Sequence, residues 1–244
     1  TTYLGLRHWL RVITRFGVTA LLATHEQKTS EALFQQIDFC WNFLPGDLGK
    51  KLRAGALRRG RASTREMYFP EMSSRMFIET AGDKMAAVGE NLQLFHGSEM
   101  SRWPNATQVT ANFLSHLVGD RTEAVLESRP YGDTGEFHQR YWEAKSGASD
   151  FTAHFVRWYE NGYHVAPVPK DFVPTEEERR MASRYRVWYL QRVANGEPTL
   201  GLSQFLLAAQ VCWRRKKARE LRDLSAQEFA EDEEDIAFPD PEDD

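Results

Sequence analysis

The chain has 244 residues, of which 41% are hydrophobic and 12% aromatic, so it can bury one sizeable core. No apolar run is long enough to span a bilayer, and the first residues lack the order of a signal peptide, so we expect neither a membrane protein nor a membrane partner. The net charge of -4 is unevenly distributed, because residues 228–244 carry ten acidic side chains and no basic one. The remainder of the chain is therefore mildly basic.

The first elements predict a helix, a strand and a second helix. Apolar residues recur at helical spacing over residues 4–13 and stop at Phe16-Gly17. The short apolar run 18–24 is typical of a buried strand. A helix follows it, with Thr29 or Ser30 as its expected N-cap and an end near Leu44.

The next part of the chain continues this alternation. The basic stretch 50–65 is expected to form a loop or a short hairpin. We predict four further strands and two helices, the strands at 75–80, 92–96, 124–127 and 153–157 and the helices at 106–117 and 137–144. Short apolar strands that alternate with helices indicate an α/β fold, with a mostly parallel sheet covered by helices on both faces.

The character of the sequence changes after residue 165. Three prolines over residues 167–174 predict an extended connector, and helical patterns follow at 175–193 and 202–224. These stretches predict a C-terminal helical extension. On composition alone, the acidic end at 228–244 is a disordered tail.

Ligands of an open parallel sheet bind at the carboxyl ends of its strands. Three polar segments follow predicted strands, at 24–26, 97–99 and 127–132. A glutamate directly after an apolar strand can deprotonate water for attack on a phosphate, and Glu99 fits that role. An exposed loop glutamate is the alternative at this point.

Two basic clusters, at residues 50–65 and 214–222, could neutralise phosphates along a nucleic acid. Solvated loop and helix faces explain such clusters equally well. Charge alone therefore leaves nucleic-acid binding open.

Two segments carry a resemblance to a known family. Residues 92–105 combine an apolar strand, Ser98-Glu99 and a Trp-Pro pair, and residues 124–144 run from a strand through Glu-Ser-Arg-Pro-Tyr-Gly into an aromatic helix. Together they resemble consecutive motifs of tailed-phage terminase large subunits. The resemblance implies a P-loop NTPase fold of the ASCE type. It also implies an ATPase domain at 1–165, and at 166–244 a helical extension and acidic connector towards a nuclease domain.

The resemblance implies ATP as substrate and Mg²⁺ as cofactor. Glu99 would be the catalytic residue, while Ser98 stands where the family usually has aspartate and would contact the metal through water. Thr1-Thr2 is similar to the end of a Walker A loop, so Thr1 or Thr2 would hold Mg²⁺. We expect the preceding glycines and lysine to be missing, which would leave the chain as given inactive.

The same resemblance extends to coupling and to partners. Ser128 and Gly132 would sense the γ-phosphate, although Arg129 stands where the family usually has threonine. The implied function is ATP-driven translocation of double-stranded DNA into a procapsid, in the bacterial host cytoplasm at the portal. The expected partners are the portal protein, the small terminase subunit and further copies in a ring.

Three arginines of the first basic cluster, Arg58, Arg59 and Arg61, are the candidate DNA contacts. Two alternatives remain at this point. The chain could be a non-catalytic DNA-binding or interaction module derived from a P-loop ATPase, or it could belong to another P-loop translocase.

Overall fold

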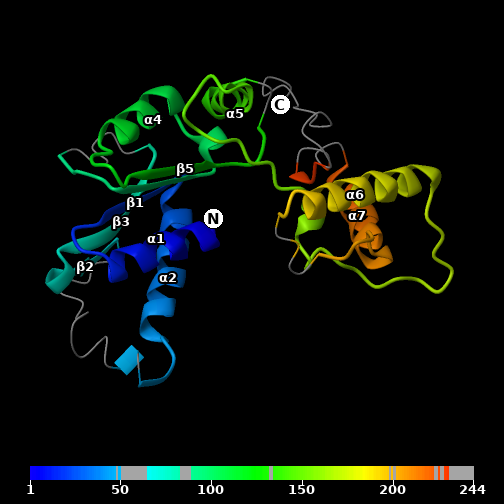
Figure 1. Ribbon diagram of the computed structural model, residues 1–244, viewed down its shortest axis with the longest axis horizontal. Coiled ribbons are helices and arrows are strands. Elements are labelled where there is room, and N and C mark those ends of the chain that lie inside the picture. The colour runs from blue at the N-terminus through cyan, green and yellow to red at the C-terminus, as the bar shows by residue number, and fades with distance from the viewer. Residues whose placement is uncertain are drawn as a thin grey trace. The chain divides into compact units, whose positions relative to one another are not determined.

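The structure, a computed structural model, describes residues 1–47, 49–50, 65–82, 89–131, 134–197, 199, 202–222, 225 and 228–230. The chain divides into two compact units (Figure 1). The first comprises residues 1–129 and 134–143, and the second comprises 130–133 and 144–244.

The first unit is built on a five-stranded sheet with the order β2-β3-β1-β4-β5. The pairs β3-β1, β1-β4 and β4-β5 are parallel, and β2 pairs antiparallel with β3. The strands are β1 (Thr19–Thr24), β2 (Glu66–Phe69), β3 (Ser74–Thr80), β4 (Leu94–Ser98) and β5 (Glu123–Glu127).

Helices cover both faces of this sheet (Figure 1). Because side chains alternate along a strand, Ala20 and Leu22 of β1 face α1 and α2, whereas Leu21 and Ala23 pack with η2 and α4 on the other face. The helices of this unit are α1 (Thr2–Thr14), α2 (Gln27–Asn42), η1 (Pro70–Met72), η2 (Met100–Arg102), α4 (Ala106–Ser115) and α5 (Glu136–Ser146). A doubly covered parallel sheet explains why its central strands are almost uninterrupted apolar runs.

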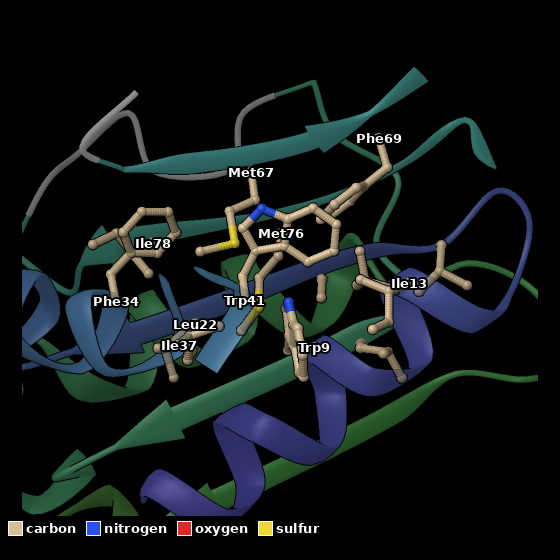
Figure 2. Packing of buried hydrophobic residues seen from close by; sticks show 14 of the residues in the cluster. Trp9, Ile13, Leu22, Phe34, Ile37, Trp41, Met67, Phe69, Met76 and Ile78 are labelled. Carbon is tan, nitrogen blue, oxygen red and sulfur yellow. The ribbon is translucent and has the colours of Figure 1, made fainter. Parts of the chain in front are cut away.

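The face under α1 and α2 holds a closely packed aromatic and aliphatic core (Figure 2). Trp41 of α2 meets Phe69 of β2 edge to face, with ring centroids 5.2 Å apart. Gly5 lets α1 approach α2, because a Cβ at this position would lie 3.3 Å from the Cδ1 atom of Ile37. This packing fixes the start of α1 above the carboxyl edge of the sheet.

The sequence predictions of four strands are confirmed, with shifts of one or two residues at their ends. Two predictions are wrong. Residues 153–157 are not a strand, since they pair with no strand among the described residues and Val156 is 75% exposed. The second helix is capped by Glu26 rather than by Thr29 or Ser30, and the Ser30 hydroxyl bonds Thr24 of β1 instead. Strand β2, whose burial alternates along the chain, was not anticipated.

The second unit contains η3 (Trp158–Glu160), α6 (Glu176–Ala194) and α7 (Ala208–Leu221). Thr175 caps α6 through a capping box with Glu178, as its sequence predicts. The carboxylate of Glu178 also binds Arg215 of α7, and an aromatic cluster around Trp158 and Tyr185 fills the space between the helices. Within the described residues, no helix has both the length and the apolar character needed to cross a bilayer.

Candidate functional site

The N-terminus of α1 meets the ends of β4 and β5 at the carboxyl edge of the sheet. Thr1, the N-cap of α1, has its Oγ1 atom 3.2 Å from Oγ of Ser98, and the same hydroxyl bonds the carboxylate of Glu127. The nitrogen of Thr1 lies 2.9 Å from Oε2 of Glu127. Ser98 is buried, with 1% of its surface exposed. Three oxygen-bearing side chains from three elements therefore converge at one point.

Thr2, the alternative magnesium ligand from the sequence, is placed differently. Its Oγ1 donates a hydrogen bond of 2.9 Å to Oε1 of Gln36 on α2. The structure thus brings Thr1 together with Ser98, and directs Thr2 to the neighbouring helix.

Glu99 follows β4 directly and has an unusual backbone conformation. Its φ of 55° and ψ of 43° lie in the left-handed region, which non-glycine residues adopt rarely and mostly where surrounding structure enforces it. Its Oε1 lies 3.8 Å from Nε of Arg129. Its Oε2 is buried and has no hydrogen-bond partner among the residues that the structure describes. A buried, unpaired carboxylate oxygen is costly and points to a group that functions with a ligand or water.

Ser128 connects the end of β5 to the segment that follows Glu99. Its Oγ lies 2.5 Å from Oγ of Ser101 and accepts a hydrogen bond of 3.1 Å from the Ser101 backbone N–H. The Ser101 hydroxyl also donates to the backbone oxygen of Arg129. The candidate catalytic and sensing residues are therefore linked through η2.

Several other candidates fall outside the described residues, namely Gly132 and the three arginines Arg58, Arg59 and Arg61. The second basic cluster is described, and its charges have partners within their own unit. Arg215 binds Glu178, and Lys217 binds Glu220 at 2.7 Å.

Sequence reasoning missed Glu127 and His96 as members of the site. His96 is fully buried on β4, and its Nε2 lies 3.1 Å from Oε1 of Glu127. Burial by itself would raise the pKa of Glu127, but the hydrogen bonds and positive charge supplied by His96 and Thr1 outweigh it and lower the pKa to about 2. Glu127 ends a predicted strand, which was the available signal, but the face to which it points depends on the register with β4.

The donors at this edge suit magnesium. Among the described residues, no cluster of three or more His, Cys, Asp and Glu side chains could hold a metal ion without other ligands. Mg²⁺ prefers oxygen ligands and is commonly held by one or two carboxylates together with waters and the phosphates of a substrate. Two hydroxyls and one ionised carboxylate, on Thr1, Ser98 and Glu127, meet that requirement.

No protein family's sequence profile matches the chain, and no curated protein matches it. Solved structures of three phage large terminases do match. The large terminase of bacteriophage HK97 is 13% identical with a TM-score of 0.56, covering 93% of this chain and 43% of that one. The ATPase domain of the Thermus phage P74-26 enzyme (11%, TM-score 0.43) covers 91% and 79%. The large terminase of another thermophilic bacteriophage (12%, TM-score 0.42) covers 59% and 34%.

The likeness to the HK97 structure concerns the fold, a mostly parallel sheet with helices on both faces. The chain spans less than half the length of that protein.

Proposed function

We propose that this chain is the ATPase motor portion of a viral DNA-packaging terminase large subunit, in which ATP hydrolysis drives double-stranded DNA into a procapsid. The observation that carries the proposal is Glu99, strained and with a buried unpaired oxygen at the end of β4, beside the cluster of Thr1 and Ser98. The HK97 likeness supports the fold that this function needs.

Glu99 is the proposed general base. A carboxylate at this position can accept a proton from the water that attacks the γ-phosphate of ATP. Bound Mg²⁺ supplies neutralisation of the phosphate charge. The helix N-terminus at Thr1 supplies N–H groups and the positive end of a helix dipole, which favour phosphate binding.

Ser128 is the proposed sensor of the γ-phosphate, together with Gly132. Its two contacts with Ser101 support this role, because a shift of Ser128 would be passed to η2 and so to Glu99. Arg129, whose guanidinium faces Glu99, offers a second connection between hydrolysis and the end of β5.

The remaining parts of the proposal concern partners. Arg58, Arg59 and Arg61 would bind DNA phosphates, and residues 166–244 would lead from the ATPase domain at 1–165 towards a nuclease domain. The portal protein, the small terminase subunit and further copies of the chain in a ring are the proposed partners. The site of action would be the host cytoplasm, at the procapsid portal.

The test of the catalytic role is Glu99→Gln in the full-length protein. We expect ATP turnover to fall by about 10²- to 10⁴-fold while ATP binding stays unchanged, because only proton transfer is removed. Glu26→Gln is the matched control, since Glu26 follows the neighbouring strand β1 with its side chain 57% exposed. Turnover unchanged in Glu99→Gln would refute the assignment.

The DNA interface has its own test. Replacing Arg58, Arg59 and Arg61 together should reduce the slope of log affinity against log salt by about 0.9 for each phosphate that the protein no longer neutralises. An unchanged slope would remove this cluster from the DNA interface. If the protein binds DNA with normal salt dependence but binds no ATP, the alternative of a non-catalytic binding module would replace the motor.

A further inference from the structure

The cluster at the carboxyl edge of the sheet contains a single negative charge. Thr1 and Ser98 contribute neutral hydroxyls that lie 3.2 Å apart, and Glu127 accepts a hydrogen bond from Thr1. A divalent cation bound by hydroxyls alone would lack the charged ligand that Mg²⁺ sites in proteins usually include. Glu127 is the carboxylate that is bonded to this cluster.

Glu99 is not placed to fill the same role. Its carboxylate lies beside Arg129, and its left-handed backbone turns the chain into η2. No hydrogen bond joins Glu99 to Thr1 or Ser98 among the described residues. The two glutamates at this edge therefore have different neighbours, which allows one to act on water and the other on the cation.

His96 holds Glu127 in its position. It lies on β4 two residues before Ser98 and faces the same side of the sheet, because side chains alternate along a strand. It is fully buried, and its Nε2 contacts Oε1 of Glu127 at 3.1 Å. Its ring meets His8 of α1 edge to face, with centroids 6.0 Å apart. A buried partner of this kind fixes the orientation of a metal-binding carboxylate.

We propose that Glu127 is the charged ligand of the nucleotide-bound divalent cation, acting with the hydroxyls of Thr1 and Ser98, and that His96 is its positioning residue. The proposal rests on the proposed ATPase function. It assigns to the end of β5 the negative charge that Ser98, at the end of β4, does not supply.

The test measures Mn²⁺ binding to the full-length protein in the presence of ADP, by electron paramagnetic resonance. Glu127→Gln should weaken Mn²⁺ binding by at least about tenfold, while ADP affinity in EDTA stays within about twofold. Glu123→Gln is the matched control, since Glu123 lies on the same strand and the same side of the sheet but outside the cluster. It should leave Mn²⁺ affinity unchanged.

A rescue experiment separates ligation from a structural role. Ser98→Asp in the Glu127→Gln background returns a carboxylate to the cluster from β4, and should restore most of the Mn²⁺ affinity. His96→Gln, whose amide can still donate to Glu127, should weaken Mn²⁺ binding less than His96→Phe. A merely structural role for Glu127 would give no rescue by Ser98→Asp.

The outcomes separate this inference from the proposed function. If the wild-type protein binds no ADP with or without Mn²⁺, the ATPase proposal fails and this inference fails with it. If the wild type binds Mn²⁺ with ADP, and folded Glu127→Gln binds Mn²⁺ equally well, the inference alone is overturned. Loss of Mn²⁺ binding with no rescue by Ser98→Asp also overturns it.

Discussion

The two ends of β5 carry the same residue type with partners of different chemistry. Glu123, at the start of the strand, binds the guanidinium groups of Arg7 and Arg11 at 2.7 and 2.8 Å and contacts Nε2 of His8 at 3.1 Å. All three partners belong to α1. Arginine stays charged at any physiological pH, so this end of the strand is held to the helix by permanent cations.

At the other end, Glu127 contacts the hydroxyl and nitrogen of Thr1 and the imidazole of His96. No lysine or arginine forms an ion pair with Glu127 among the described residues. Hydroxyls and imidazoles can rearrange around a ligand, whereas a pair of arginines would occupy the carboxylate. The comparison teaches that α1 is fixed at the amino end of β5, which leaves the carboxyl end available for chemistry.

The largest expected effect concerns His8, which lies between the two ends. Burial lowers the pKa of His8 from 6.5 to about 4. The unfolded chain therefore takes up a proton between pH 6.5 and 4 that the folded chain does not, and folding stability should fall by up to about 3 kcal/mol as the pH decreases through this window. Urea denaturation at several pH values would measure this loss.

The control for that prediction is a histidine outside this region. His8→Gln keeps a hydrogen-bond donor to Glu123 but does not titrate, so the loss of stability between pH 6.5 and 4.5 should become smaller. His154→Gln, at an exposed position of the second unit, should leave the loss unchanged. Equal pH profiles of His8→Gln and wild type would contradict the burial of a neutral imidazole.

The second prediction breaks the fixed end of β5 directly. Glu123→Gln removes the charge that compensates Arg7 and Arg11, and should lower the free energy of unfolding by about 2 kcal/mol, because hydrogen bonds to charged groups are the strong ones. Glu66→Gln, in a pair 3.8 Å from Arg75 on another strand, should cost less than about 1 kcal/mol. Equal losses in urea denaturation would mean that Glu123 is no stronger a tie than a single surface pair.

The third prediction acts on the end of β4 from the opposite face. A Cβ at Gly97 would lie 2.8 Å from Cη2 of Trp103 and 3.1 Å from Cδ2 of Leu126, and the Trp103 indole donates to the backbone oxygen of Ser98. Gly97→Ala should cost about 1 to 2 kcal/mol of stability through overpacking, and should lower ATP turnover by displacing Ser98.

Gly82→Ala is the matched control for Gly97→Ala, because its Cβ would make an ordinary contact of 3.5 Å with Pro104. Thermal unfolding of the two variants should differ clearly. If Gly97→Ala is as stable and as active as Gly82→Ala, the close approach of Trp103 does not hold the end of β4.

The smallest expected effect concerns the pair of Glu99 and Arg129. The Arg129 side chain is 56% exposed, so the pair is worth about 0.2 to 1 kcal/mol. Arg129→Thr should make Glu99 a slightly stronger base and raise basal ATP turnover by about 1.5- to 5-fold. Arg129→Lys should behave like the wild type. A fall in turnover with Thr would mean that Arg129 itself takes part in hydrolysis.

Local pattern was sufficient for most elements of the fold. Short apolar runs and helical periodicity identified four strands and the main helices, since these signals come from neighbouring residues. The strand expected at 153–157 failed because an apolar run forms a strand only where another strand is available to pair with it. Strand β2 was missed for the related reason that four residues beside a basic stretch give little local signal.

The sequence by itself determined the fold class, the elements whose ends carry polar residues, and Glu99, Ser98 and Thr1 as candidates. Only the tertiary structure decided that Thr1 rather than Thr2 meets Ser98, and that Glu127 and His96 join them. The reason is physical. Which side chains share one face at the edge of a sheet depends on the register between strands and on the packing of α1, and both are set by contacts between residues far apart in the chain.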